Sequence, residues 1–552
     1  MSELTELLDH IGYSARPQQT KLYELLTGVT NDGVIVQAGT GTGKSIAVLA
    51  AAAHAYRKTG IPSLVVTPTR VLMDQYMASD VPAAAEAFGL TITELRGKRW
   101  YHCDLSSVLA EGEDPGCLGR DVDCSMRNWL GLEPEEDWRA VAVPEPEYRC
   151  DYQAAKFAAS RADIVVTNSD FWIINDRTLP EPIFDLQGAV FVDESHQLEA
   201  KLKDYAGRSV REKELRKHYE GAGIKLARSL EQYRDGMAAT VGGDVHAAIR
   251  ACWARGPGEA DPATGLPKPG RKLSDRALEL QEALSQMLHR LDNPSQNCLI
   301  WSDGWSIKME WIDISPAAHD LLTARPFGLV SATIPSSMPS ALGVPDVKVE
   351  DVGHPFDYAS QATVRISEYD GSYRFAQERG NKVARVNELW EEIERTEGGC
   401  LLLFSAFKDL EFVYDELWSR LRKSGRPVLR QNDQVNPRSN ADLAAEFKAA
   451  GNAVLFGSES FATGFDVPGD ALQLVSIWKM PFPGKDPVTD ALARRFFPRY
   501  KDLMLTRVVQ AAGRLIRTTS DTGRLFIADS RAEQLLTSKD MMVRHLGEFG
   551  RH

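Results

Sequence analysis

The chain has 552 residues, of which 43% are hydrophobic and 26% are charged, so we expect about three or four domains rather than one core. Its net charge of −13 gives no general basic footprint for nucleic acid, although a groove lined locally with Lys and Arg is not excluded. The longest apolar run, residues 46–56, is far shorter than the ~20 residues that cross a bilayer, and the acidic N-terminus lacks the order of a signal peptide.

Short β-branched runs alternate with amphipathic stretches, a pattern typical of parallel sheets covered by helices. The expected strands are residues 33–37, 63–67, 163–167, 189–193 and 327–331, then residues 400–405, 453–457, 472–477 and 524–528. They predict two α/β lobes, the second starting near residue 350.

Two insertions interrupt the first lobe, which we expect to comprise residues 1–96, 161–199 and 319–349. Residues 97–160 hold four of the seven cysteines. Residues 200–318 read mostly helical and end in a hairpin whose turn is Asp303-Gly304. Residues 350–552 are expected to form the second lobe.

A phosphate-binding loop follows the first strand, and its residues are Ala38, Gly39, Thr40, Gly41, Thr42, Gly43, Lys44 and Ser45. The glycines let backbone N–H groups wrap the phosphates at the positive end of the next helix. Lys44 is expected to reach the β- and γ-phosphates, and the Ser45 hydroxyl to ligate Mg²⁺. The alternative is a Gly-rich turn that binds no ligand. It is disfavoured because a strand, the loop and a helix follow one another in the sequence as in phosphate-binding loops.

Two carboxylates stand at the end of the strand at residues 189–193. Asp193 is expected to hold the magnesium, and Glu194 to polarise the attacking water. An Asp-Glu pair alone is usually a solvated turn, so this interpretation depends on the buried strand and on the phosphate loop upstream. Together the motifs predict a nucleoside triphosphatase.

Two arginines, Arg514 and Arg517, lie near the end of the second lobe. Because they are three residues apart, we expect them on one face of a helix. An isolated pair would be read as a salt-bridged surface helix. With half of an ATP site already in the first lobe, we expect both to contact the γ-phosphate.

Four cysteines, Cys103, Cys117, Cys124 and Cys150, cluster in one short segment. In an intracellular protein such a cluster suggests metal before disulfide. The spacing lacks the paired CxxC of a zinc ribbon, and four thiolates can bind either Zn²⁺ or a [4Fe–4S] cluster. Metal-free thiols are the remaining alternative. The other cysteines, Cys252, Cys298 and Cys400, are expected to pack as buried apolar residues.

These motifs resemble those of the XPD/DinG group of superfamily 2 helicases, in order over nearly the whole chain. Further segments carry the resemblance: Arg16-Pro17-Gln18-Gln19 (glutamine motif), Thr67-Pro68-Thr69-Arg70 (motif Ia), Asp193-Glu194-Ser195-His196 (DEAH-like box), Ser331-Ala332-Thr333 (SAT motif), Phe404-Ser405 (motif IV), Gly464-Phe465-Asp466-Val467-Pro468-Gly469 (motif V), Lys479-Met480-Pro481-Phe482 and, as motif VI, Gln510 to Arg517 with Asp521 and Gly523. The resemblance implies that Gln19 reads adenine and that His196 links hydrolysis to motion. It also implies that Gln510, Gly464 and Asp466 belong to the nucleotide site.

The resemblance extends to the cysteine insertion, because the stretches at Cys103 and Cys150 are similar to those at the first and fourth cluster ligands of that group. It therefore favours [4Fe–4S] over zinc. Motif Ia (Thr67, Pro68, Thr69, Arg70) is expected to grip the DNA backbone. Arg99 and Trp100, which could also be a solvated face, suit phosphate contact and base stacking.

The resemblance implies an α/β fold of two RecA-like P-loop lobes, the first interrupted by a cluster insertion and a helical arch insertion. It implies a cytoplasmic, monomeric, ATP-dependent DNA helicase of a bacterial or phage-infected cell, with ATP, Mg²⁺ and [4Fe–4S] as cofactors and no membrane contact. It would translocate on single-stranded DNA from 5′ to 3′ and unwind duplex or forked DNA. No attached exonuclease is expected, since only about fifteen residues precede the glutamine motif.

Two alternatives remain. A DNA-stimulated ATPase could remodel protein–DNA complexes with little unwinding, because Phe461-Ala462-Thr463-Gly464 stands where the family's motif V reads F-W-E-G. A scaffold that only binds DNA is disfavoured by the intact lysine, carboxylates and arginines. No residue identifies a replication or repair partner.

Overall fold

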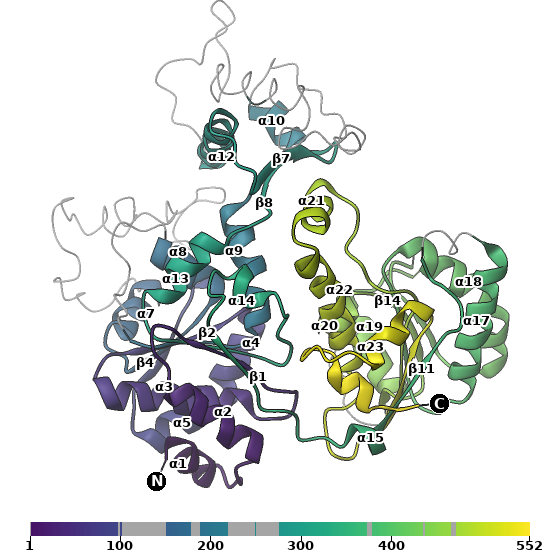
Figure 1. The fold of residues 1–552 in the computed structure, drawn as a ribbon, viewed down its shortest axis with the longest axis horizontal. Coiled ribbons are helices and arrows are strands. Elements are labelled where there is room, and N and C mark those ends of the chain that lie inside the picture. The colour runs from purple at the N-terminus through teal and green to yellow at the C-terminus, as the bar shows by residue number, and fades with distance from the viewer. Residues whose placement is uncertain are drawn as a thin grey trace, which may run out of the picture.

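The computed structural model of the chain describes residues 2–97, 100–101, 151–177, 188–218, 249, 275–372, 378–433, 436–464 and 471–551. Two parallel sheets, each covered by helices on both faces, form two lobes that lie side by side (Figure 1). The two α/β lobes predicted from the sequence are therefore confirmed. Within the described ranges, no helix is both long and apolar enough to cross a membrane.

Seven parallel strands form the sheet of lobe 1, in the order β10-β1-β9-β5-β2-β4-β3. Their bounds are β1 (Val34–Gln37), β2 (Ser63–Thr67), β3 (Ile92–Leu95), β4 (Ile164–Asn168), β5 (Val190–Val192), β9 (Phe327–Ser331) and β10 (Lys348–Asp351). In the register, Gln37 lies opposite Ser331 and Val66 opposite Val192. The carboxyl ends of β1, β9, β5 and β2 thus form one edge, where ligands of such sheets bind.

Helices cover both faces of this sheet, which is why its strands are buried on both sides. One face carries α1 (Glu3–His10), α2 (Pro17–Thr27), α3 (Lys44–Thr59), α4 (Arg70–Gln75), a π-helix (Tyr76–Asp80) and α5 (Val81–Phe88). The other carries α7 (Asp151–Ala159), α8 (Ser169–Arg177), α9 (Leu198–Ala206), α13 (Ser315–Thr323) and α14 (Met338–Ala341). A 3₁₀ turn (Ser195–Gln197) leads from β5 into α9.

Seven parallel strands also form the sheet of lobe 2, in the order β13-β14-β12-β15-β16-β11-β17. Their bounds are β11 (Ala362–Ile366), β12 (Cys400–Phe404), β13 (Val428–Arg430), β14 (Val454–Ser458), β15 (Leu474–Ile477), β16 (Gly523–Ile527) and β17 (Gly550–Arg551). Pairing of β17 with β11 brings the C-terminal segment of the chain back to the strand that follows the connection between the lobes.

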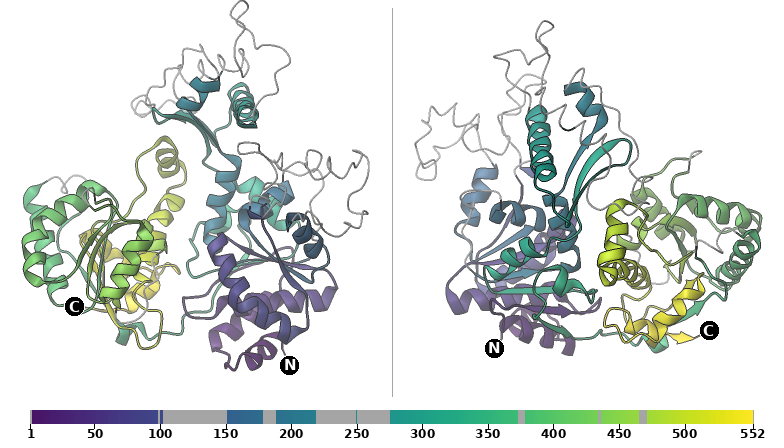
Figure 2. Two further views of the ribbon diagram at one scale, coloured as in Figure 1. Left: turned by 180° about the vertical axis from the view of Figure 1, so that it is seen from behind. Right: turned by 45° about the horizontal axis from the view of Figure 1, so that its top comes forward.

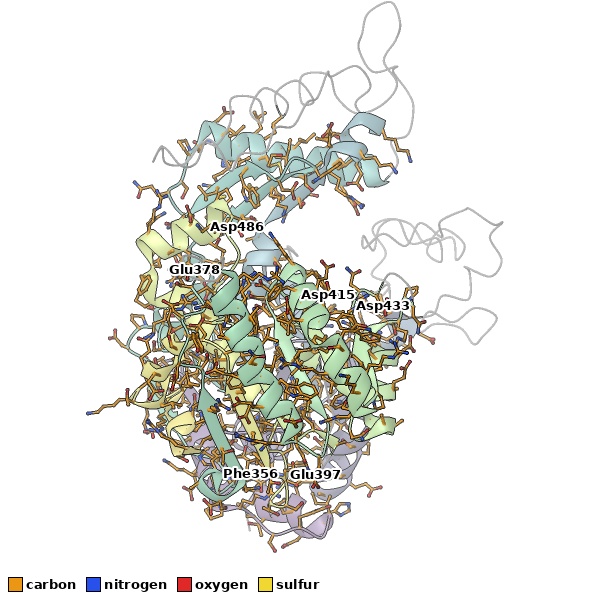
Figure 3. The ribbon with its side chains drawn as sticks, turned by 90° about the vertical axis from the view of Figure 1, so that its right-hand side faces the viewer. Phe356, Glu378, Glu397, Asp415, Asp433 and Asp486 are labelled. Atoms are coloured by element: carbon orange, nitrogen blue, oxygen red, sulfur yellow. The ribbon has the colours of Figure 1, made fainter. Side chains whose placement is uncertain are left out.

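The outer face of this sheet is covered by α17 (Arg379–Glu394) and α18 (Phe407–Ser424). Figure 3 views this side of lobe 2, with Asp486 at its upper end and Phe356 at its lower end. The other face carries α15 (Tyr358–Gln361), α19 (Asn440–Ala450), α20 (Ser460–Gly464), α22 (Phe497–Ala512), α23 (Glu533–Leu536) and, around α23, 3₁₀ turns at Ser530–Ala532 and Arg544–Glu548.

A third sheet is antiparallel and stands above the two lobes (Figure 2). Its strands are β6 (Arg208–Arg211), β7 (Cys298–Ser302) and β8 (Ser306–Trp311), and α10 (Glu212–His218) and α12 (Asp275–Asp292) pack on one of its faces. We call these elements the arch unit. Its other face contacts α21 (Pro487–Arg495) of lobe 2 through Leu299, Trp301, Ile312, Ala491 and Leu492.

The structure differs from the predicted reading in a few places. The hairpin with its turn at Asp303-Gly304 is present, but β6 was not predicted in a segment that reads mostly helical. The predicted limits at residues 199, 318 and 349 fall inside α9, α13 and β10, which belong to lobe 1. α7, which lies within the predicted cysteine insertion, also packs in lobe 1. An amphipathic pattern predicts a helix but does not say which sheet it covers.

Candidate nucleotide site and nucleic-acid interface

The phosphate loop, residues 38–43, joins β1 to the N-terminus of α3. Gly41 and Gly43 both have positive φ angles, +73° and +76°. A Cβ on Gly43 would lie 2.6 Å from the amide nitrogen of Gln19, and a Cβ on Gly41 would meet the ring of Phe356. Side chains other than glycine would be strained at both positions, so the loop keeps its backbone close to its neighbours.

Lys44 opens α3 and points back along the loop. Its Nζ lies 3.4 Å from the carbonyl oxygen of Ala38 and 3.9 Å from Oε1 of Glu194. Ser45 lines a pocket of about 450 Å³ together with Lys44, Asp193 and Glu194. A hydroxyl and a carboxylate beside a lysine are the donors that a phosphate-bound Mg²⁺ uses, so these residues fit the ion.

A separate pocket of about 480 Å³ lies beside the loop and is lined by Arg16, Pro17, Gln18, Pro355, Phe356, Arg517, Thr518 and Thr519. Its position next to the phosphate loop suits the base of the nucleotide. Gln19 does not line it, because its side chain is buried and donates to the carbonyl oxygen of Gly43 at 3.1 Å. Gln18 lines it and donates to the carbonyl oxygen of His354 at 3.1 Å. Gln18, a neighbour of Gln19 in the same motif, thus lines the pocket, and Phe356 is a site residue that the sequence did not predict.

Asp193 follows β5 and is buried, with 3% of its surface exposed. Its Oδ1 accepts a hydrogen bond from the backbone nitrogen of Glu194 at 2.8 Å, and its Oδ2 accepts one from the hydroxyl of Tyr76 at 2.7 Å. Burial and the adjacent Glu194 raise the pKa of Asp193 above its ordinary value. A cation in this pocket would offset both effects.

Glu194 adopts a left-handed backbone conformation, with φ +46° and ψ +42°. For a residue other than glycine this conformation is strained, and such strain gathers at functional sites. Burial acts to raise the pKa of Glu194, but Lys44, His196 and Ser331 lower it to about 2. The carboxylate is thus held ionised, as a base that accepts a proton from water must be.

A chain of hydrogen bonds links Glu194 to lobe 2. The amide nitrogen of Gln510 can only donate, so Nε2 of His196 accepts at 3.0 Å and its Nδ1–H donates to Oγ of Ser331 at 2.7 Å. The hydroxyl of Ser331 also accepts from the backbone nitrogen of Thr333 and donates to Oε2 of Glu194 at 3.2 Å. The structure thus brings together residues predicted from the DEAH-like box, the SAT motif and motif VI.

Gln37, the last residue of β1, links the start of the phosphate loop to three distant segments of the chain through its side chain. The sequence did not predict this role. Oε1 of its side-chain amide accepts from the backbone nitrogen of Ile334 at 3.1 Å. Its amide nitrogen donates to Oδ2 of Asp351 at 3.2 Å and to the carbonyl oxygen of Met541 at 2.9 Å. The strand before the phosphate loop is therefore bonded to the C-terminal segment of lobe 2.

Arg514 and Arg517 line the cavity of about 750 Å³ between the lobes, together with Gly39, Thr40, Gly41, Glu194, His196 and Gln510. Burial lowers the pKa of both arginines. The prediction that they share one face of a helix is wrong, because α22 ends at Ala512. After the bond from the backbone nitrogen of Gly513 to the carbonyl oxygen of Val509, the next bonds span only three residues, so Arg514 lies in a turn beyond the helix and Arg517 in the bend that follows.

Two of the predicted DNA contacts lie against each other. Arg70 begins α4, and its guanidinium lies 3.9 Å from the ring centroid of Trp100, of which 46% is exposed. Thr69 caps α4 through its side chain, which accepts from the backbone nitrogen of Leu72. Thr67 ends β2, and Pro68 lines the cavity between the lobes. This cation–π pair joins motif Ia to Trp100 and leaves part of the indole exposed.

Several predicted site residues, among them Arg99, Cys103, Cys117, Cys124, Cys150 and Asp466, lie outside the described residues. Gly464 is the last residue of α20. The part of the chain that the structure describes contains no group of three or more His, Cys, Asp or Glu side chains suited to a metal. Its free cysteines, Cys298 and Cys400, are buried, as predicted for both.

The two ends of the cysteine insertion meet in lobe 1. The rings of Tyr101 and Tyr152 lie 5.6 Å apart, and the hydroxyl of Tyr101 accepts from the backbone nitrogen of Arg96 at 3.0 Å. The chain therefore leaves and re-enters lobe 1 at adjacent places, beside β3 and α7.

Two family models match parts of the chain. Residues 16–99 match the DEAD/DEAH box helicase family, and residues 389–547 match the helicase C-terminal domain. These segments contain the phosphate loop and motif Ia in lobe 1, and Gln510, Arg514 and Arg517 in lobe 2.

Relatives and solved structures extend the match over nearly the whole chain. The ATP-dependent DNA helicase YoaA of Escherichia coli (strain K12) is 25% identical, over 94% of this chain and 92% of its own length. The ATP-dependent helicase DinG of Mycobacterium tuberculosis is also 25% identical, over 94% of this chain and 89% of its own length. A solved XPD helicase structure shares the fold, with a TM-score of 0.59, 16% identity and coverage of 98% of this chain and 99% of its own. The predicted pair of RecA-like lobes is thus confirmed.

Proposed function

We propose that this chain is an XPD/DinG-like superfamily 2 helicase, which hydrolyses ATP to move along single-stranded DNA and to separate the strands of duplex or forked DNA. The observation that carries the proposal is the hydrogen-bonded chain from Gln510 through His196 and Ser331 to Glu194. It joins the residue that activates water in lobe 1 to a helix of lobe 2, as a motor that converts hydrolysis into lobe movement requires.

ATP binds with its phosphates on the loop and its base in the pocket of Gln18 and Phe356. Lys44, now 3.9 Å from Glu194, turns to the β- and γ-phosphates, whose charge replaces that of the carboxylate. Ser45 and Asp193 would hold Mg²⁺, which supplies charge neutralisation at the phosphates.

In hydrolysis, Glu194 accepts a proton from the attacking water. The water oxygen bonds to the γ-phosphorus while the bond from that phosphorus to the β–γ bridging oxygen breaks. Arg514 and Arg517 line the same cavity from lobe 2 and would stabilise the charge on the transferred group. Loss of that group removes what the arginines bind, so the lobes can separate again.

The strand would lie on motif Ia, where the Arg70–Trp100 pair contacts one phosphate and one base. Travel from 5′ to 3′ and a monomeric protein are proposed on the resemblance alone. A cytoplasmic location is proposed because the relatives are bacterial DNA helicases. The alternative of a translocase with little unwinding is not favoured, since relatives that cover nearly the whole chain are named helicases.

The test is a forked-duplex unwinding assay with ATP, run on wild type and Lys44→Ala. Loss of the lysine is expected to slow hydrolysis by about 10²–10³-fold and to abolish strand separation, because a charge at the transferred phosphate is removed. DNA-stimulated hydrolysis without strand separation in the wild type would instead favour the translocase, and equal activity of both proteins would refute the site.

We further propose that Cys103, Cys117, Cys124 and Cys150 bind a [4Fe–4S] cluster. The support is the number of thiolates, the resemblance of the flanking stretches, and the contact between Tyr101 and Tyr152. That contact places the two ends of the cysteine insertion next to each other. Iron and zinc content of anaerobically purified protein test it. About four iron per chain, lost in Cys103→Ser but kept in Cys252→Ser, is expected; zinc in place of iron would overturn it.

A further inference from the structure

Tyr76 touches the magnesium site without being part of any motif recognised in the sequence. Its side chain is 2% exposed, and its hydroxyl donates to Oδ2 of Asp193 at 2.7 Å, a contact between residues far apart in the chain. Because an ionised carboxylate can only accept, the phenol hydroxyl is the donor in this contact.

A change of helical pitch accompanies this contact. α4 ends at Gln75, residues Tyr76–Asp80 form a π-helix, and α5 begins at Val81. The backbone nitrogen of Val81 bonds to the carbonyl oxygen of Tyr76, five residues earlier, and Pro82 at the start of α5 has no N–H to continue an ordinary ladder. Single π turns inside α-helices are rare and often mark functional sites. This one borders the pocket that Ser45 and Asp193 line.

We propose that Tyr76 is a positioning residue for the magnesium ion, and this inference rests on the nucleotide site proposed above. Oδ1 of Asp193 is held by the backbone of Glu194 and Oδ2 by Tyr76. With one donor on each oxygen, the carboxylate cannot rotate, and its remaining lone pairs keep one direction in the pocket beside Ser45. Partners that orient a metal ligand in this way contribute to metal affinity.

Simple packing is the competing explanation, because the Tyr76 ring is part of the core on this face of lobe 1. Tyr23 provides the comparison within the same core. It is also buried and donates its hydroxyl to a carboxylate, Oε2 of Glu3 at 2.5 Å. Neither Tyr23 nor Glu3 lines the pockets of the nucleotide site. A purely structural role predicts similar behaviour for the two tyrosines, whereas positioning predicts that only Tyr76 affects the metal.

The experiment compares Tyr76→Phe with Tyr23→Phe in the full-length chain. Mn²⁺ binding is titrated by electron paramagnetic resonance in the presence of a non-hydrolysable ATP analogue, and the Mg²⁺ concentration for half-maximal hydrolysis is measured alongside. Tyr76→Phe is expected to weaken Mn²⁺ about 10–100-fold and to raise the Mg²⁺ midpoint correspondingly, with saturating Mg²⁺ restoring much of the rate. Tyr23→Phe is expected to match the wild type in both, and metal-free binding of the analogue should be the same in all three proteins.

Thermal unfolding of both variants completes the comparison, since each loses one buried hydrogen bond and keeps its ring. Equal Mn²⁺ affinity of wild type and Tyr76→Phe would overturn the inference and leave the proposed function intact. An equal loss of Mn²⁺ affinity in both variants would overturn it in favour of general destabilisation. Absence of Mn²⁺ binding by the wild type with the analogue would instead refute the nucleotide site on which the inference rests.

Discussion

The carboxylate of Asp502 accepts a hydrogen bond from the backbone nitrogen of Ser337 at 2.8 Å, which fastens α22 to the loop after the SAT motif. The same carboxylate accepts the hydroxyls of Ser336 and Ser337. Near the other end of α22, Gln510 donates to His196. This lobe 2 helix is therefore bonded to lobe 1 both beside the SAT motif and beside the DEAH-like box.

Replacing Gln510 by alanine should weaken the coupling between the lobes without removing the site. Because one hydrogen bond to His196 is lost, we expect the activation free energy of DNA-stimulated hydrolysis to rise by about 0.5–1.5 kcal/mol. The rate should therefore fall roughly 2- to 12-fold. Unwinding should fall at least as much, while ATP binding stays unchanged. The control is Gln534→Ala, because Gln534 is an exposed residue of α23. Unaltered unwinding in Gln510→Ala would show that the hydrogen-bonded chain carries no coupling.

Replacing Glu194 by glutamine should remove the base and keep nucleotide binding. Single-turnover hydrolysis is expected to fall by about 10²–10⁴-fold, because glutamine cannot accept the proton of the water. Binding of an ATP analogue should persist, measured by equilibrium fluorescence. Analogue binding lost together with hydrolysis would assign Glu194 to binding rather than to proton transfer.

The pH dependence of hydrolysis follows from the same carboxylate. Burial acts to raise the pKa of Glu194, but Lys44, His196 and Ser331 lower it from 4.5 to about 2. The lowered pKa means that the ionised carboxylate stabilises the folded chain fully above pH 4.5. This stabilisation is lost as the pH falls toward 2, where the carboxylate takes up a proton. Between pH 5 and pH 8 the wild-type rate should show no acidic limb due to this residue. An acidic limb that is absent from the residual activity of Glu194→Gln would contradict the prediction.

Replacing Trp100 by alanine should weaken single-stranded DNA binding. Loss of one stacking surface costs about 1–3 kcal/mol, measured by fluorescence anisotropy of a labelled oligonucleotide at fixed salt. Trp418 on α18 is the matched control, because 44% of it is exposed, against 46% of Trp100, on the outer side of lobe 2. Equal losses in the two variants would argue against a specific contact at Trp100.

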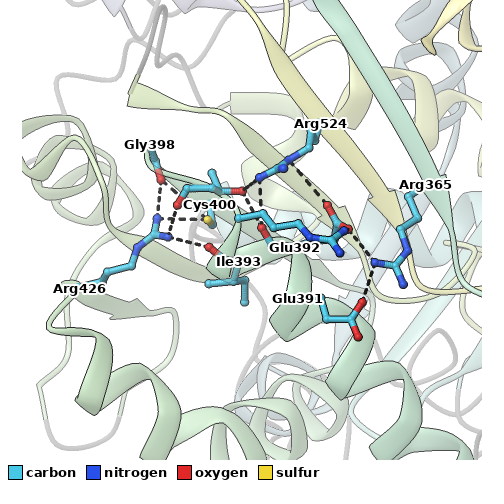
Figure 4. A network of polar contacts seen from close by, with 10 residues as sticks. Arg365, Glu391, Glu392, Ile393, Gly398, Cys400, Arg426 and Arg524 are labelled. Carbon is cyan, nitrogen blue, oxygen red and sulfur yellow. Dashed lines mark hydrogen bonds and ion pairs between the residues drawn. The ribbon is translucent and has the colours of Figure 1, made fainter. Parts of the chain in front are cut away.

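Replacing Glu392 by alanine should destabilise lobe 2, while Glu391→Ala should not. Figure 4 shows both side chains beside Arg365, at 2.8 Å from Glu392 and 3.0 Å from Glu391. Only 2% of Glu392 is exposed, against 50% of Glu391, and Arg524 also faces Glu392 at 3.7 Å.

Removing the buried partner should therefore lower the free energy of unfolding by about 1–3 kcal/mol, because the half-buried Arg365 and Arg524 lose the carboxylate that they share. Removing the exposed partner should cost about 0–1 kcal/mol. Urea unfolding, followed by circular dichroism, measures both. Similar midpoints for the two variants would contradict the assignment of the buried pair as the stabilising one.

The fold and the main nucleotide residues could be predicted because their signals are local. The phosphate loop is one continuous segment whose glycines must follow a strand and precede a helix, and Asp193 and Glu194 stand at the end of an apolar run. Parallel strands place such segments at one edge, so predicting the strands was enough to bring Lys44, Glu194 and Ser331 together.

The features that the sequence did not predict are tertiary contacts between distant segments and the position at which a helix ends. Tyr76 reaches Asp193 beside a π turn that no period of apolar residues records. Gln37 makes its bonds to chain segments some 300 and 500 residues away, and nothing near it in the sequence specifies them. Arg514 was placed on a helix because a three-residue spacing says nothing about the helix end at Ala512.

The apolar contact between α21 and β7 closes a ring of contacts through lobe 1, the arch unit and lobe 2. The arch unit is continuous in sequence with lobe 1. Its residues Leu299 and Trp301 contact α21 of lobe 2, and α22 of lobe 2 is bonded to lobe 1. In the proposed motor, rotation of one lobe against the other would require α21 either to carry the arch unit with it or to slide across β7. Each stroke at the phosphates is thus also a displacement at the far end of the molecule.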